Sequence, residues 1–220
     1  MHKDYGILNA NLFVQIKRKK MTKITTQRFY AWAGVAGMSL LALSPAIASA
    51  ATSTANTTIN AAIASTISIT SSGTVNVALT PTAGGVVSSA SDTVSVSTNN
   101  VTGYNLTLAN GDTNTSLASG GNTIAAHAGT YAVPTALTGN GWGYAVAGGN
   151  FTASYTAESN SGTSTTKWAG VPSSASPQAL KSTGTTASAD TTTVWYGVRA
   201  TTSQAAGTYT DTVTYTATTN

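Results

Sequence analysis

The last fourteen residues, Gly207-Thr-Tyr-Thr-Asp-Thr-Val-Thr-Tyr-Thr-Ala-Thr-Thr-Asn220, contain the clearest structural pattern in the sequence. Threonines at every even position from 210 to 216 alternate with other residue types at the odd positions. A period of two is typical of a half-buried β-strand, because successive side chains point to opposite faces. We therefore predict a closing strand with Tyr209, Val213 and Tyr215 in a core. Asp211 breaks this apolar face near the start of the strand, where a charge is compatible with the rim of a sheet.

Similar alternation recurs through the chain after residue 58, and no stretch there shows a sustained helical period of 3.6 residues. Many short strands separated by Gly, Asn and Pro turn signals favour an antiparallel sheet protein. We predict an all-β fold, an antiparallel Greek-key (Ig-like) β-sandwich. A β-helix is the alternative, and it is disfavoured because no fixed repeat period is found. The predicted strands lie at 59–69, 75–79, 94–96, 104–108, 142–146, 151–155, 194–200 and 209–217.

Two hairpins are predicted from the turn residues. Gly148-Gly149-Asn150 would join 142–146 to 151–155, and Ser203–Gly207 would join 194–200 to the closing strand.

The N-terminus has the pattern of a secretory signal peptide. Seven of the ten basic residues precede residue 30, an apolar run follows, and Ala48-Ser49-Ala50 supplies a small-x-small cleavage site. We expect a signal peptide over residues 1–50, with Met21 as an alternative start, a flexible leader over 51–57 and one domain over 58–220. An uncleaved membrane anchor is the alternative, but the run of about 15 residues is shorter than the roughly 20 that a spanning helix needs.

Residues 51–220 carry three basic and five acidic side chains, a net charge of −2. This slightly acidic balance argues against nucleic acid as a partner. Charged residues make up 7% of the whole chain, far below the typical share of about 25%. Recurrent Val, Ile, Thr and Tyr nevertheless favour an ordered β-domain over disorder. Cysteine is absent, which excludes disulfides, thiolate metal sites and a cysteine nucleophile.

No pattern predicts an enzyme or a cofactor. His127 is the single histidine after residue 50, and no G-x-S-x-G elbow surrounds any serine. Asp190 and Glu158 are the best candidates for a pair of catalytic carboxylates, but exposed acids that blunt sheet edges explain them more simply.

Two sets of residues are candidates for binding. Asn110, Asp112 and Asn114 place side-chain oxygens at alternate positions, a weak calcium pattern that a Gly/Asn turn also explains. Aromatic rings in glycine-rich and polar surroundings can stack on sugars, which makes Trp142, Tyr144 and Trp168 candidate ligand contacts. Core packing is favoured for Trp142, as for Trp195, whereas Trp168 is the candidate for an exposed contact.

Two short motifs resemble those of WxL domains. Gly103-Tyr104-Asn-Leu106-Thr-Leu108 is similar to the first WxL motif, Trp-x-Leu. The stretch from Tyr209 to Ala217, with Val213, Thr214 and Tyr215, is similar to the second. Tyrosine stands where that family has tryptophan, and Val213 and Ala217 replace leucines. The resemblance implies a secreted bacterial protein held non-covalently at the cell wall through peptidoglycan. The closing strand also resembles that of spore-coat and pilin-type sandwich subunits.

We therefore expect a non-catalytic, secreted structural or adhesion protein of the bacterial cell surface, with envelope polysaccharide or other surface proteins as partners. The first alternative is a self-assembling fibre or coat subunit joined by strand addition, because long uncharged strands present edges to other chains. The second alternative is a carbohydrate-binding module for peptidoglycan. Contact with a membrane is expected only during export through the signal peptide.

Overall fold

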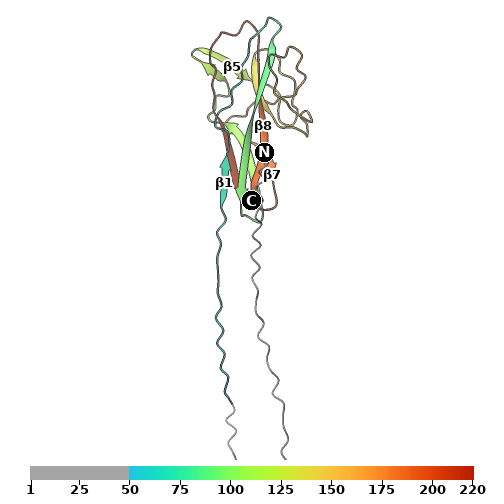
Figure 1. Ribbon diagram of the computed structural model, residues 1–220. Helices are drawn as coiled ribbons and strands as arrows, with labels where there is room; N and C mark the ends of the chain where they lie inside the picture. Colours follow the sequence, from blue (N-terminus) through green and yellow to red (C-terminus); the bar gives the residue numbers. More distant parts are fainter. Residues whose placement is uncertain (1–49) are drawn as a thin grey trace, which may run out of the picture. The chain divides into compact units, whose positions relative to one another are not determined.

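The computed structural model describes residues 50–220, and this part of the chain contains β-strands but no helix (Figure 1). Residues Thr58–Asn220 form one compact unit. Residues 50–57 are exposed and belong to no strand. The predicted signal peptide lies outside the described residues except for Ala50. Within the described range no helix is long and apolar enough to cross a membrane. The prediction of an all-β fold is confirmed for the described residues.

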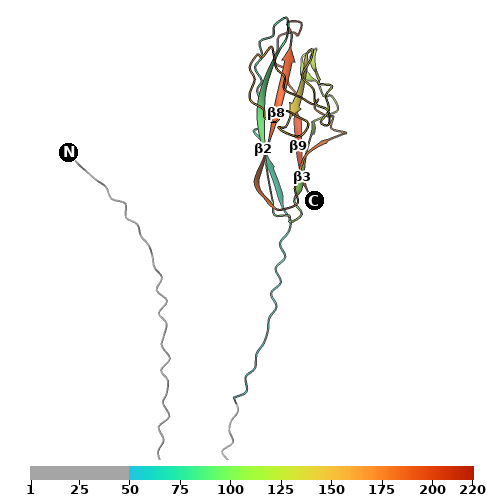
Figure 2. The same ribbon diagram turned by 90° about the vertical axis from the view of Figure 1, so that its right-hand side faces the viewer.

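The strands form two sheets. The larger has six strands in the order β1-β2-β8-β6-β5-β4, and the smaller has three in the order β7-β3-β9. All neighbours are antiparallel except β5 and β6, which are parallel. Figure 2 shows β2 and β8 in one layer and β3 and β9 in the other. The strands are β1 (Ile67–Thr70), β2 (Val86–Thr98), β3 (Tyr104–Asn110), β4 (Leu117–Ser119), β5 (Asn122–Ala126), β6 (Gly141–Ala145), β7 (Gln178–Ser182), β8 (Ala187–Ala200) and β9 (Val213–Thr219).

The core lies between the two sheets. The larger sheet contributes alternate residues such as Val94 and Val96 of β2, both 0% exposed. The smaller sheet contributes Tyr104, Leu106 and Leu108 of β3, which are also fully buried. The period-two pattern of these segments therefore corresponds to burial of one face, as the sequence predicts.

A β-bulge in β8 directs a charged side chain toward the core. Val96 of β2 pairs with Asp190, but Thr98 pairs with Ala187, so β8 has one extra residue between these pairs. Ala189 takes up the bulge with a positive φ of 49°. Asp190 consequently lies opposite the buried Val96 and reaches Tyr104 of the other sheet, whose hydroxyl is 2.8 Å from its carboxylate.

Both predicted hairpins are wrong. β6 pairs with β8, and residues 151–155 form no strand but bury Phe151 and Tyr155 in the core cluster. β9 pairs with β3, so Ser203–Gly207 lies in a connection between the two sheets instead of a turn within one. Residues 75–79 alternate in burial as predicted, but they form no strand.

Candidate functional site

Trp168 lies in the core, and the prediction that it is an exposed contact residue is wrong. Its side chain is 0% exposed and its indole N–H donates to Thr166 Oγ1 at 2.9 Å. The ring of Tyr155 packs edge-on against it with centroids 5.3 Å apart. The indole also covers Gly197 of β8, because a Cβ built there would meet three indole atoms at 2.7 to 2.8 Å. A glycine in the facing strand therefore makes the space that the indole fills.

The other two candidate ligand contacts are also buried. Trp142 and Tyr144 on β6 are 3% and 1% exposed, so neither presents a ring face to solvent. Trp142 stacks on Tyr196 and donates its indole N–H to the Thr115 carbonyl at 2.9 Å. The core position expected for Trp142 is confirmed.

The oxygens of the weak calcium pattern accept hydrogen bonds from the backbone. Asn110 Oδ1 accepts from the N–H of Asp112, Asp112 Oδ1 from that of Asn114, and Asn114 Oδ1 from that of Ser116. Successive turns of this kind explain the alternate spacing, because each side chain bonds the amide two residues ahead. Among residues 50–220 no group of three His, Asp or Glu side chains could hold a metal ion.

The candidate acid–base residues lie apart and have structural partners. His127 Nε2 is 2.8 Å from Thr135 Oγ1, and burial lowers its pKa below the ordinary value. The Glu158 carboxylate accepts a hydrogen bond from the Ser164 hydroxyl. The backbone carbonyl of Glu158 accepts the N–H of Ser89, near the start of β2. Asp190 lies opposite Val96, seven residues further along β2, or roughly 20 Å away. These two acids therefore do not form a carboxylate pair.

Asp190 joins the two sheets near the end of the domain at which the chain enters β1, which we call the base. Its carboxylate is 2.6 Å from the Lys181 ammonium of β7 and accepts the Tyr104 hydroxyl. The Lys181 hydrogen bond lowers the pKa of Asp190 below its ordinary value, while burial, together with the nearby Asp190 carboxylate, raises that of Tyr104. This cluster stabilises the packing of β3 and β7 on β8.

The two motifs that resemble WxL domains lie side by side in the smaller sheet. β3 and β9 pair along their full lengths, with Leu106 opposite Ala217 and Leu108 opposite Tyr215. Tyr209 lies outside β9, where its hydroxyl donates to the Ala205 carbonyl. Tyr215 crosses to the larger sheet, with its hydroxyl 2.6 Å from that of Tyr196. Burial raises the pKa of both tyrosines above the ordinary value.

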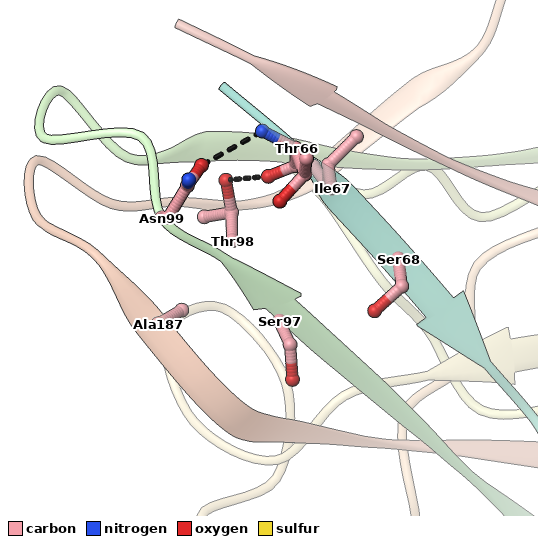
Figure 3. A pocket seen from close by; sticks show the side chains of 7 residues that line it. All are labelled: Thr66, Ile67, Ser68, Ser97, Thr98, Asn99 and Ala187. Carbon is pink, nitrogen blue, oxygen red and sulfur yellow. Dashed lines mark hydrogen bonds between the residues drawn. The ribbon is translucent and has the colours of Figure 1, made fainter. Parts of the chain in front are cut away.

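A groove of about 330 Å³ lies at the base of the domain, between β1, the end of β2 and the start of β8 (Figure 3). Thr98 and Asn99 fix the chain where it enters β1. Thr98 Oγ1 donates to the Thr66 carbonyl at 2.7 Å, and Asn99 Oδ1 accepts the Thr66 N–H at 2.7 Å. Asn99 Nδ2 also donates to the Ala64 carbonyl at 2.9 Å. The chain preceding β1 is therefore held in line with the strand.

Among the large apolar side chains of the described residues, the two with the highest exposed fractions lie in the chain that precedes β1. Ile59 and Ile63 are 83% and 87% exposed, whereas Ile67, with the same parity, packs against the core. The sequence pattern predicts one long strand or two short ones over 59–69, but only 67–70 is a strand. The alternation continues through 59–66, but these residues have no partner strand, because β2 ends at Thr98, opposite Ile67.

Comparisons with protein families, with curated proteins and with solved structures find no match for this chain.

Proposed function

We propose that this chain is a non-catalytic, exported structural or adhesion protein of the bacterial cell surface. The observation that carries the proposal is the division of the side chains between contacts that join the two sheets and a surface of hydroxyl groups. Its large aromatics and Asp190 hold two sheets together without disulfides, while Thr214, Thr216 and Thr218 of β9 face solvent. Such a domain offers a hydroxyl-rich surface with few charges around a core. An Ig-like Greek-key arrangement, with envelope polysaccharide and surface proteins as partners, belongs to the same proposal.

Export is tested by fractionating cells that produce the native chain. We expect the protein on intact cells or in the medium, accessible to added protease, with a mature N-terminus at Ala51. Ala48→Arg with Ala50→Arg should block cleavage, whereas Ser49→Arg, at the tolerant middle position, should not. An uncleaved wild-type protein that stays in the cytoplasm would overturn the proposal.

A subunit of a fibre or coat is the second candidate, and one observation favours it. Ile59 and Ile63 are almost fully exposed on an extended segment of an otherwise well-packed domain. Exposed apolar strands tend to pair with other chains. Sedimentation velocity over a hundred-fold range of concentration tests this function. A single monomer peak throughout would exclude strand-mediated assembly.

A further inference from the structure

The chain projects past the base of the domain through Thr58–Ala64, which we call the leading segment. Asn99 bonds the last residue of this segment, Ala64, and also Thr66 beyond it. Because β2 ends at Thr98, the leading segment has no strand beside it among the described residues. It runs below β1 in Figure 1. Ile59, Ala61 and Ile63 share the parity of Ile67 and therefore form an apolar row on one face of the extended chain. This row is a strand face without a sheet.

A matching free edge lies on β9. β9 bonds β3 on one side, and no other described strand pairs with its second side. Its neighbour across the sandwich is β1, and we call the line between them the β1–β9 seam (Figure 1). Inward side chains of β9, Tyr215 among them, are only partly buried, whereas those of β3 are fully buried. Ile69 of β1 is 37% exposed. The core is therefore incompletely covered along the seam.

The other three sheet edges have protective features that β9 lacks. Natural sheets avoid edge-to-edge pairing by short strands, charged residues, prolines and bulges. β1 has four residues and β4 has three, while β7 carries Lys181 and a register shift against β3. β9 has seven residues with no charge, no proline and no register shift. It is the one long, regular free edge in the described part of the chain.

The leading segment fits this edge in length and chemistry. Both have seven residues, and neither carries a charge. Pairing would place Ile59 and Ile63 over the partly covered seam, and would leave Asn60 and Ala62 on the outer face beside the threonines of β9. The segment cannot turn back easily onto its own domain, because it contains neither Gly nor Pro and continues straight into β1. A second copy is the occupant that matches.

We propose that the leading segment of one copy adds as a strand to the free edge of β9 in a second copy, covering its β1–β9 seam. This inference rests on the fibre or coat function proposed above and names its donor and acceptor. The two surfaces are different, so the contact is heterologous and need not close. Repeated addition builds an open chain of subunits, each donating from its base and accepting along its edge.

The first test compares assembly of the full chain, purified after export, with that of two double variants. Ile59→Ser with Ile63→Ser should raise the concentration for half-assembly by about 100-fold or more, since two isoleucines lose their burial. Val101→Ser with Val133→Ser is the matched control, because these valines are 76% and 66% exposed outside both surfaces. The control should assemble like the wild type. Equal circular dichroism spectra would show that both variants fold.

The second test locates the acceptor, using the absence of cysteine from the chain. Ala62→Cys is mixed, in the presence of a mild added thiol oxidant, with Thr214→Cys, Thr216→Cys or Thr218→Cys, all on the outer face of β9. Residues directly opposite each other on adjacent antiparallel strands have Cα atoms about 4.5–5.5 Å apart, which lies within the range of about 4.4–6.8 Å that a disulfide spans. We expect cross-linked pairs with at least one of the three. Ala62→Cys with Ala179→Cys, on the edge strand β7, is the control and should not cross-link.

The outcomes separate this inference from the assembly function. Loss of assembly in the isoleucine variant, together with cross-links confined to β9, supports the inference. Equal assembly of the isoleucine variant and the wild type, or cross-links of Ala62→Cys to Ala179→Cys of β7 instead of to β9, overturns the inference and leaves the assembly function standing. A wild-type protein that is monomeric at every concentration overturns both.

Discussion

Replacing Gly197 by alanine tests whether Trp168 is a core residue or an exposed ligand contact. A methyl group at Gly197 would lie 2.7 to 2.8 Å from three atoms of the indole, against an optimum of about 3.5–4.0 Å between carbons. The indole has little room to move, because it is fully buried and its N–H bonds Thr166. The edge-on ring of Tyr155 holds another side of it. The added methyl group must therefore displace packed atoms.

The size of the effect follows from two opposing contributions to the free energy of unfolding. Extra methyl groups in a packed core typically cost about 1–3 kcal/mol. Alanine in place of glycine within a strand regains about 0.5–1 kcal/mol of backbone entropy. We therefore expect a net loss of up to about 2.5 kcal/mol, which for a domain of this size lowers Tm by up to about 10 °C.

The assay is urea and thermal unfolding of the purified protein, followed by circular dichroism and tryptophan fluorescence. Gly184→Ala is the control, because a Cβ there meets no atom within 4 Å, and it should be neutral or stabilising by up to about 1 kcal/mol. In a Trp168→Ala background the Gly197→Ala change should cost nothing more, because the clash is gone. Equal Tm values for Gly197→Ala and Gly184→Ala would refute the packing argument.

Three further predictions follow from the pairing of strands and charges. Deletion of residues 209–217 removes most of β9, so no cooperative unfolding transition should remain; a stable, soluble truncated protein would show that this strand is detachable. The depressed pKa of Asp190 stabilises the fold above the unfolded-state value of about 3.9, and this contribution is lost as the pH falls below it. Urea midpoints between pH 6 and 3 should therefore fall less steeply for Lys181→Met, and equal slopes would contradict the assignment. Asn99→Ala should speed amide exchange at Thr66 about five-fold, the equivalent of about 1 kcal/mol, and leave β8 amides unchanged; unaltered exchange at Thr66 would count against the role of Asn99.

Local alternation predicted the buried faces of β2 and β3, but it did not predict every strand or any strand's partner, since residues 75–79 and 151–155 alternate and form no strand. Val94, Val96, Leu106 and Leu108 are buried as their spacing predicts, because the period of two is a property of each strand alone. The pairing of β9 with β3 depends on residues about one hundred positions apart. No local turn signal encodes that distance, which explains why the predicted hairpin between 194–200 and the closing strand is wrong. The predicted hairpin after 142–146 is wrong because residues 151–155 form no strand.

The candidate sites were harder to predict because exposure depends on distant residues. Trp168 lies in a polar stretch, which favours exposure, yet the space that buries it is made by Gly197 in another strand. Ile63 and Ile67 have the same local pattern and opposite surroundings, because β2 ends opposite Ile67. In both cases a neighbouring strand decides the outcome.

Asp211 marks the point at which the closing stretch passes from one group of strands to the other. Thr210 bridges to Ala118 of β4, whereas Val213 begins the pairing with β3. Between them, the Asp211 carboxylate accepts from Asn110 Nδ2 at 2.5 Å and from the Thr212 amide at 2.7 Å, so it satisfies polar groups where the backbone changes partners. The single run of alternating threonines thus includes residues that pair with two different strands, β4 and β3. The part after Asp211 enters the smaller sheet at its edge and pairs on one side only, which leaves β9 a neutral, regular edge. Solvent or a second chain must satisfy that edge, and the exposed isoleucines of the same protein favour the second chain.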